Sequence, residues 1–129
     1  FGVDAGDEFD AHAIAKYTVE CLQESLPVAV PGVVFLSGGM SEAQATQALD
    51  AMNRLVAKKP WALSFSYGRA LQASCLKSYM GKKENVEAAS KVLLDRAHLN
   101  SLATLGQYEA GHENNPDALA DLFQKNYSY

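Results

Sequence analysis

The sequence of 129 residues contains no uninterrupted apolar run that approaches the roughly 18 residues of a membrane-spanning helix. The excess of acidic over basic residues is also small, and the formal net charge is only −4. So small an acidic balance predicts no bulk attraction to nucleic acid or to an anionic membrane. With 48% hydrophobic and 20% charged residues, the composition is typical of one ordinary globular domain.

Cysteine is rare as well, with Cys21 and Cys75 as the two examples. So sparse a pair, without a secretory signal, predicts reduced and buried thiols rather than a disulfide. The chain starts at Phe1 and has no signal-like or transit-like beginning. We therefore expect either a processed protein or part of a longer polypeptide.

Motifs of metal and nucleophile chemistry are missing. The histidines are scattered, without ligand spacing or a partner carboxylate motif, at His12, His98 and His112. Neither Ser37 nor Ser66 stands in a G-x-S-x-G nucleophile elbow. The single tryptophan, Trp61, is interpreted as a packing residue rather than a ligand-binding aromatic.

Hydrophobic periodicity predicts a βα succession, which implies parallel strands. A serine and a glutamine in S-x-x-Q spacing, Ser41 and Gln44, predict a capping box at the start of the second helix. The expected helices are 8–26, 41–57, 69–79 and 84–103, and the expected strands are 32–37 and 61–68. The strand at 32–37 is continuously apolar, so we expect both of its faces to be covered.

Two helices carry apolar stripes that we interpret as core faces. One stripe comprises Ala45, Leu49, Met52 and Val56, and the other comprises Val86, Ala89, Leu93, Leu94 and Ala97. After Thr104 the composition shifts to turn formers, most strongly over residues 106–118. We therefore expect residues 104–129 to form a mobile tail.

A short internal similarity joins the two predicted strands. VVFLSGGM (33–40) aligns without gaps to ALSFSYGR (62–69), at an offset of 29 residues that suits one βα unit. In a parallel array, both Ser-x-Gly segments would follow the carboxyl ends of their strands, where ligands bind. The sequence therefore predicts two neighbouring loops.

Two interpretations of these loops stay open from the residues alone. Glycine permits close approach of a ligand to backbone N–H groups, the following helices supply positive N-termini, and Arg69 adds a planar cation suited to phosphate oxygens. On this view, Ser37, Gly38 and Gly39 hold one phosphate together with Ser66–Arg69. The alternative is that the glycines serve only as turn residues.

Longer motifs resemble a known family, the class I fructose-1,6-bisphosphate aldolases. The resemblance rests on FLSGG (35–39), KPWALSFSYGRALQAS (59–74), GKKEN (81–85), NSLATLGQY (100–108) and the terminal Tyr129. It implies an α/β fold, the C-terminal portion of a TIM (β/α)₈ barrel from helix 6 to helix 8 followed by a tail. Residues 1–103 would be the barrel part, and residues 104–129 the mobile tail.

The resemblance also implies a site. The positions that match the family's substrate-phosphate contacts are Ser37, Gly38, Ser66, Gly68 and Arg69, with Leu36 and Gly39 beside them. Tyr129 matches the terminal tyrosine that assists proton transfer in the family. No metal or other cofactor is implied.

The family reaction uses a lysine that forms a Schiff base with the substrate ketone. The resemblance places that lysine on strand 6, before the start of this chain. None of the eight lysines here is a plausible substitute, so we expect the chain alone to be inactive. Two barrel strands cannot close a sheet either, so its edges would be exposed.

Beyond the reaction, the resemblance implies a sugar-phosphate substrate, a cytoplasmic location, a homotetramer and a capacity to bind cytoskeletal partners. The alternative to an enzyme is a non-catalytic aldolase fragment that acts as a binding or scaffold piece. Chain length distinguishes the two, because a stable product of 129 residues without the rest of the barrel would favour the fragment. The absence of a lysine on the upstream strand would exclude the enzyme.

Overall fold

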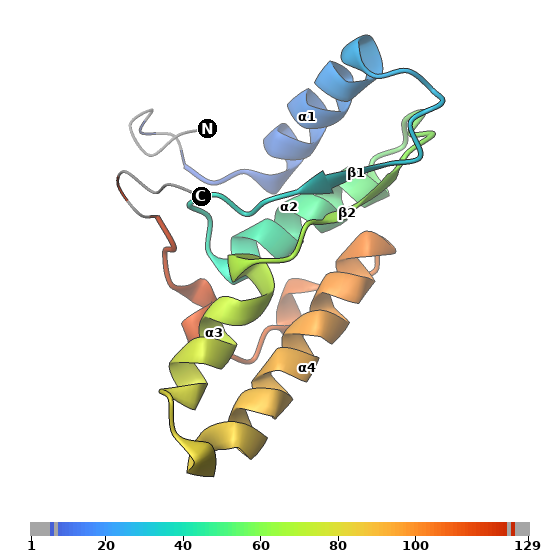
Figure 1. Ribbon diagram of the computed structural model, residues 1–129. Helices are drawn as coiled ribbons and strands as arrows, with labels where there is room; N and C mark the ends of the chain where they lie inside the picture. The colour runs from blue at the N-terminus through green and yellow to red at the C-terminus, as the bar shows by residue number, and fades with distance from the viewer. Residues whose placement is uncertain (1–5, 7, 124, 126–129) are drawn as a thin grey trace.

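A computed structural model describes residues 6, 8–123 and 125 of the chain (Figure 1). The elements are α1 (Ala11–Ser25), β1 (Gly32–Phe35), α2 (Glu42–Arg54), β2 (Ala62–Phe65), α3 (Arg69–Tyr79), the short 3₁₀ helix η2 (Lys83–Asn85), α4 (Val86–Thr104), and the 3₁₀ turns η3 (Ala110–His112) and η4 (Pro116–Leu119). The predicted alternation of helix and strand is confirmed. Both strands are shorter than the apolar runs that predicted them.

The strands pair in parallel, as the βα succession predicted. Among the described residues the sheet consists of β1 and β2, with Gly32 opposite Ala62 and Phe35 opposite Phe65. The ladder joins residues 30 positions apart, since 62 − 32 = 30, whereas the sequence match has an offset of 29. Each residue of β1 therefore lies one place away from its sequence match.

The expectation that β1 is covered on both faces was wrong. Exposure alternates along the strand, and the side chain of Val34 is 62% exposed. Val33 and Phe35 pack against the core instead. Successive side chains of a strand point to opposite faces, and in this structure the helical core covers only the face of Val33 and Phe35.

Side-chain caps mark where α1 and α2 begin. The Asp10 carboxylate accepts hydrogen bonds from the backbone N–H groups of His12 and Ala13, at 2.9 and 3.1 Å, which starts α1. The predicted capping box of α2 is confirmed, because Ser41 and Gln44 each accept from the other's backbone N–H, at 3.1 and 3.0 Å.

The core lies between α1, α2, the strands and the second half of α4. Trp61 and Leu63 are buried there, and the indole Nε1 donates to the backbone oxygen of Pro27 at 2.9 Å. The prediction that Trp61 is a packing residue is therefore confirmed. The cysteines are free but not buried as expected, since Cys21 is exposed and Cys75 is partly exposed.

The apolar stripe of α2 was predicted correctly except at its end. Ala45, Leu49 and Met52 are buried, but Val56 is fully exposed because the helix ends at Arg54. Beyond that point the chain no longer follows the helical repeat that would turn Val56 towards the core.

The buried face of α4 was predicted correctly at Ala89, which is 5% exposed, but wrongly at the large apolar residues of the stripe. Val86, Leu93 and Leu94 are exposed, Leu94 by 70%. The helix instead buries a mixed polar and apolar face made of Ala89, Arg96, Leu99, Asn100 and Ala103. A count of apolar residues alone could not find this face, because its two large polar members are buried with hydrogen-bond partners.

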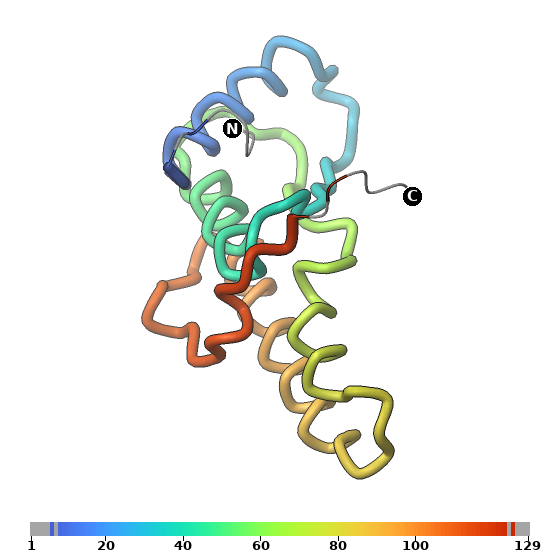
Figure 2. The backbone as a smooth tube through the Cα atoms, turned by 90° about the vertical axis from the view of Figure 1, so that its left-hand side faces the viewer, coloured from blue at the N-terminus to red at the C-terminus, as the bar shows by residue number. Residues whose placement is uncertain are grey.

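The chain after α4 turns back along the molecule, and we call residues 105–123 the return segment (Figure 2). Tyr108 and Ala118 within it are 3% and 0% exposed, and η4 packs on α2 and α3. These residues therefore pack on the helices, although their composition is that of turn formers. The mobility of residues 104–129 stays a prediction.

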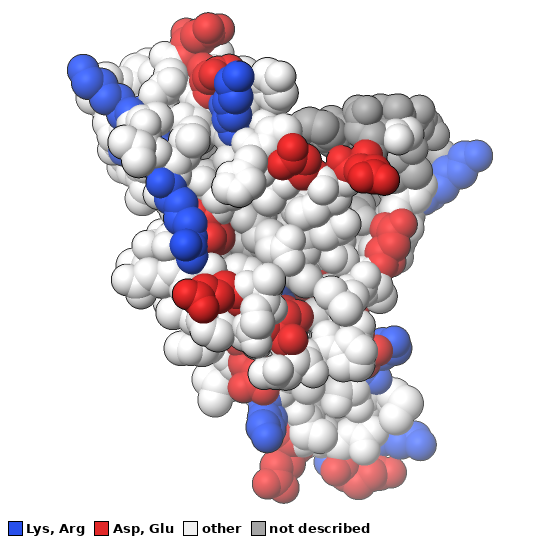
Figure 3. All heavy atoms as spheres, turned by 180° about the vertical axis from the view of Figure 1, so that it is seen from behind, with Lys and Arg blue, Asp and Glu red and all other residues white. Residues whose placement is uncertain are grey.

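The surface offers no membrane element in the part of the chain described above, where each helix is either too short or too polar to cross a bilayer. Acidic and basic side chains are interspersed over the face shown in Figure 3. Such mixing agrees with the small net charge of −4.

Two positions of the same predicted stripe test this core. Leu49→Ala removes a side chain that is 0% exposed, so it should lower the free energy of unfolding by about 2–5 kcal/mol. The matched control Val56→Ala alters a fully exposed side chain and should stay within about 0.5 kcal/mol. Urea unfolding of the protein measures both, and equal losses would contradict the assignment of this core.

Candidate functional site

The two Ser-x-Gly loops lie side by side at one edge of the strand pair. Parallel pairing brings the carboxyl ends of β1 and β2 to the same edge. Beyond the last paired residues, the N–H of Ser66 donates to the carbonyl oxygen of Phe35 at 3.0 Å. The predicted neighbourhood of the loops is therefore confirmed, and what they bind remains a separate question.

The first loop is a tight turn before α2. The N–H of Met40 donates to the carbonyl oxygen of Ser37 at 3.1 Å, and Gly38 has a φ of +58° inside this turn. A left-handed φ is strained for most other residues, so glycine is required there. Ser37 itself is 6% exposed, whereas Leu36 is 52% exposed.

The second loop leads directly into α3. The carbonyl oxygen of Gly68 accepts from Leu71 and Gln72, at 3.0 and 3.1 Å, and no side chain caps this helix N-terminus. Arg69 is the first helical residue and Ser66 is exposed. An uncapped helix N-terminus beside a guanidinium group is chemically suited to an anion.

The return segment ends against both loops. Arg69 donates from Nη1 to the carbonyl oxygen of Leu122 at 2.6 Å. A Cβ atom placed on Gly39 would lie 3.1 Å from the ring of Phe123. These contacts bring the C-terminal part of the chain to the predicted phosphate position. Tyr129, the predicted catalytic residue, lies outside the described residues.

A hollow of about 1100 Å³ opens beside the first loop. Its walls are residues 36–40, one side of α1, and the return segment at Leu119, Asp121 and Phe123. Ser66, Gly68 and Arg69 do not line it. The structure thus brings both loops to one edge, but only the first loop borders this hollow.

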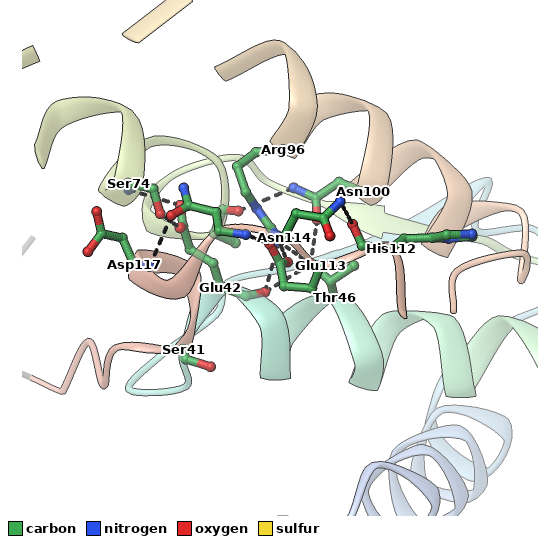
Figure 4. A network of polar contacts seen from close by, with 12 residues as sticks. Ser41, Glu42, Thr46, Ser74, Arg96, Asn100, His112, Glu113, Asn114 and Asp117 are labelled. Atoms are coloured by element: carbon green, nitrogen blue, oxygen red, sulfur yellow. Dashed lines mark hydrogen bonds and ion pairs between the residues drawn. The ribbon is translucent and has the colours of Figure 1, made fainter. Parts of the chain in front are cut away.

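Behind the loops lies a buried polar network that the sequence did not predict (Figure 4). Glu42, the first residue of α2, is 0% exposed, and its carboxylate accepts hydrogen bonds from the N–H and hydroxyl of Ser74 on α3. Arg96 is 1% exposed, donates to the backbone oxygen of Glu42 at 3.1 Å, and forms an ion pair with Glu113. Burial raises the pKa of Glu42, although the Ser74 hydrogen bonds and Arg96 oppose this shift.

Thr46 and Asn100 extend this network. Arg96 donates to the Thr46 hydroxyl at 2.6 Å, and this oxygen lies 2.7 Å from the side-chain oxygen of Asn100. Asn100 donates from Nδ2 to the backbone oxygen of Ala70 at 3.2 Å. Three helices, α2, α3 and α4, are therefore joined by buried hydrogen bonds, which are strong only when every partner is present.

One sequence signal could have revealed the network. Arg96 and Asn100 share a helix face with Ala89 and Ala103, at the spacing of seven and four residues that places side chains on one side. Small residues on that face allow close packing. Long polar residues between them are then enclosed and must be paired.

Lys59 has a partly buried ammonium group and a shifted pKa, so it is the lysine to compare with a Schiff-base lysine. Burial lowers its pKa, a feature that Schiff-base lysines use. Its ammonium group, however, donates to the backbone oxygens of Asn53 and Leu55 at the C-terminal end of α2. It precedes β2, at the opposite end of the strand from the loops, so it cannot serve this site.

Metal chemistry has no visible framework here. Within the part of the chain that the structure describes, no three His, Cys, Asp or Glu side chains are grouped to hold a metal ion. The chemical groups that do meet at the loop edge are backbone N–H groups, serine hydroxyls and one guanidinium.

The fold and the loop pair define an α/β protein of the parallel βα class, with its candidate ligand loops at the carboxyl edge of the strands. A family model is more specific. The model of glycolytic class-I fructose-bisphosphate aldolases matches residues 1–129, and the chain belongs to this family. The resemblance expected from the sequence is therefore confirmed.

Individual relatives agree. The chain is 52% identical over 99% of its length to cytosolic fructose-bisphosphate aldolase 4 of Arabidopsis thaliana, and 59% identical over 90% to the cytoplasmic isozyme of Spinacia oleracea. A solved aldolase of Plasmodium falciparum, in complex with TRAP and a small-molecule inhibitor, matches 84% of the chain with a TM-score of 0.79 and 50% identity. The chain spans about a third of the length of these relatives, 33%, 32% and 31%.

The turn at Gly38 can be tested by one added methyl group. Gly38→Ala should lower the free energy of unfolding by about 1 kcal/mol, because alanine is strained at a left-handed φ. Gly111→Ala is the matched control, since its Cβ would meet nothing within 4 Å at an ordinary φ, and it should stay within about 0.5 kcal/mol. Equal stability of the two variants in urea unfolding would contradict the turn.

The pKa of Glu42 makes a signed prediction for stability. Its folded pKa lies above 4.5, the ordinary value for a glutamate side chain. The protonated carboxyl therefore contributes its full stabilisation below pH 4.5, and that contribution is lost as the pH rises through the folded pKa. Glu42→Gln has no such proton to lose, so its free energy of unfolding should rise relative to wild type as the pH increases.

Urea unfolding of both proteins, measured from about pH 4 to about pH 8, checks this difference. Glu87→Gln, which alters an exposed carboxylate in the first turn of α4, should leave the wild-type profile unchanged. A constant difference between wild type and Glu42→Gln at every pH would show that Glu42 does not titrate in this window.

Proposed function

We propose that this chain is part of a class I fructose-bisphosphate aldolase. The parent enzyme reversibly cleaves fructose 1,6-bisphosphate to dihydroxyacetone phosphate and glyceraldehyde 3-phosphate through a Schiff base. In this proposal the chain is the C-terminal portion of a (β/α)₈ barrel, and its role is to bind a substrate phosphate. Family membership supports the reaction.

One observation carries the proposal for the site, namely the position of two glycine-containing loops on neighbouring parallel strands. The proposed phosphate contacts are Ser37, Gly38 and Gly39 on the first loop, with Ser66, Gly68 and Arg69 on the second, and Leu36 lines the site. The uncapped N-terminus of α3 adds its partial positive charge. These groups bind an anion by hydrogen bonds and charge without a metal ion.

The remaining catalytic groups have separate origins. We propose that the Schiff-base lysine lies on a barrel strand outside this sequence, which agrees with the position of Lys59 at the wrong end of β2. Tyr129 is proposed to assist proton transfer when the C-terminal tail reaches the active site. The contacts of Leu122 and Phe123 with the two loops support this path for the chain.

The family also suggests the setting of the parent enzyme. Relatives are named cytosolic or cytoplasmic isozymes, and a chloroplastic relative from Arabidopsis thaliana matches as well. We propose a cytoplasmic homotetramer that acts on a sugar phosphate and uses no metal or organic cofactor.

A second candidate function is protein binding. The aldolase of Plasmodium falciparum was solved in complex with TRAP, so an aldolase surface can hold a protein partner. A non-catalytic fragment that serves as a scaffold, or a parent that binds cytoskeletal partners, would use such a surface.

Borohydride trapping tests the proposed function directly. The full-length protein is incubated with dihydroxyacetone phosphate and reduced, and its peptides are analysed by mass spectrometry. We expect one reduced adduct, on a lysine outside residues 1–129. Absence of any adduct would contradict the reaction and favour the binding function, and an adduct on one of the eight lysines here would contradict the proposed origin of the nucleophile.

Substitution of Arg69 separates the phosphate site from the reaction. Arg69→Ala should lower kcat/KM for fructose 1,6-bisphosphate by about a hundredfold, because one charged contact to the substrate phosphate is lost. Lys82→Ala removes an exposed cation away from the loops and should leave kcat/KM unchanged. Equal activity of the two variants would remove Arg69 from the site.

A further inference from the structure

The buried network of Glu42, Thr46, Ser74, Arg96 and Asn100 lies directly behind the two proposed phosphate loops. This position is notable because none of these side chains belongs to the loops or to the proposed site. All but Ser74, at 2% exposure, are no more than 1% exposed. Their effect on a ligand at the loops would therefore have to pass through the backbone.

The network holds the first loop through the start of α2. Glu42 is three residues after Gly39, and its backbone oxygen accepts a hydrogen bond from Arg96. Thr46, one turn further along the same helix, accepts a second bond from the same guanidinium nitrogen at 2.6 Å. The first turn of α2 is thereby fixed to α4.

The network holds the second loop through α3. Asn100 donates to the backbone oxygen of Ala70, the residue that follows Arg69. Ser74, one turn later, donates to the Glu42 carboxylate from both its N–H and its hydroxyl. The helix that carries Arg69 is thus bound to α2 as well as to α4.

Arg96 makes the contacts with the first turn of α2 and with the return segment, and Asn100, four residues later on the same helix, makes the contact with α3. The Arg96 guanidinium donates to Glu42 and Thr46 of α2 and pairs with Glu113 of the return segment (Figure 4). The pairing with Glu113 satisfies a charge that would otherwise be buried alone, which would be strongly unfavourable. The planar fork of arginine can reach these partners at once, whereas the ammonium group of lysine cannot do so in the same geometry.

We propose that Arg96 is a positioning residue for phosphate binding. It holds the first turn of α2 against α4, whose Asn100 holds α3, and so fixes the spacing between the loop before α2 and the loop before α3. Through Glu113 it couples that spacing to the return segment. This inference rests on the proposed function, because it assigns a role to residues behind the proposed phosphate site. It predicts that removal of the Arg96 guanidinium weakens phosphate binding by more than the accompanying loss of folding stability can explain.

A natural control stands at the other end of α2. Arg54 also pairs with a carboxylate, Asp50 at 2.6 Å, and also donates to the return segment, at the backbone oxygen of Tyr108. It makes these contacts at the last turn of α2, away from both loops. Arg54 and Arg96 therefore both join α2 to the return segment, but only Arg96 is fully buried, reaches from α4 and contacts α2 next to a loop.

The experiment uses the full-length protein and inorganic phosphate as the probe. Arg96→Lys should weaken the binding of inorganic phosphate by about tenfold in calorimetry, because the loops lose their fixed spacing. The KM for fructose 1,6-bisphosphate should rise by a similar factor with a smaller change in kcat. Arg54→Lys should leave the phosphate affinity and the KM within about twofold of wild type, even if its melting temperature falls as much as that of Arg96→Lys.

Ser74→Ala provides a second and milder variant, in case Arg96→Lys fails to fold. It removes only the hydroxyl bond to Glu42 and should weaken phosphate binding in the same direction by a smaller factor. Glu113→Asp keeps the charge opposite Arg96 and should restore most of the affinity that Glu113→Ala loses.

The outcomes separate this inference from the proposed function. Phosphate binding that is abolished by Arg69→Ala and weakened by Arg96→Lys, but not by Arg54→Lys, supports both. Binding that depends on Arg69 but is unchanged in Arg96→Lys and Ser74→Ala overturns the positioning role alone. Equal weakening by Arg54→Lys and Arg96→Lys overturns it in favour of a general effect on stability. A wild-type protein that binds no phosphate overturns both proposals.

Discussion

The parallel pairing of β1 with β2 is the constraint on which the rest of the structure depends. Because parallel strands need a crossover, α2 must cover the sheet between them, and both carboxyl ends must meet at one edge. This one pairing places the Ser37–Met40 turn beside the loop that begins α3, and it leaves the amino ends of the strands, with Trp61 and Lys59, on the opposite side. The location of every group discussed for phosphate binding follows from the ladder and not from any contact between the loops themselves.

The buried polar network imposes a second constraint, which is the free energy needed to bury charged and polar groups. Enclosing Arg96 and Glu113 removes two charges from water, and their mutual attraction offsets that loss only when hydrogen bonds satisfy the remaining donors and acceptors. Thr46 and the backbone oxygen of Glu42 accept from Arg96, while Ser74 and Asn100 bind Glu42 and Ala70 beside it. A shift of any one helix would leave a buried polar group unpaired, which is costlier than losing an apolar contact. The network therefore specifies one arrangement of α2, α3 and α4, where an apolar core of similar volume would tolerate several.

Sequence patterns predicted the elements of this fold well where local chemistry decides, and poorly where tertiary contacts decide. The capping box at Ser41, the ends of α3 and the parallel order of the strands follow from local residue types. The exposure of Val34 does not follow from local residue types, because an apolar run does not indicate which of its two faces a helix will cover. The same limit explains α4, where Leu94 is exposed and Arg96 is enclosed. The candidate loops were located from their glycines, but the residues behind them were missed because their burial depends on partners up to 54 positions away, as between Glu42 and Arg96.

Exposed apolar side chains on the strands bear on how the chain is completed. Val34, Leu36 and Tyr67 are 62%, 52% and 48% exposed, and they follow or belong to strands whose outer edges have no partner among the described residues. Open edges with apolar side chains favour association with further strands. In a closed barrel those strands would come from the two thirds of the relatives' length that this chain does not span. Closure would pair these lateral edges and bring the carboxyl ends of the further strands beside the two loops. Under the proposed function, those neighbouring strand ends would complete the site that the two loops begin, since the active residues of such a barrel come from the ends of several strands.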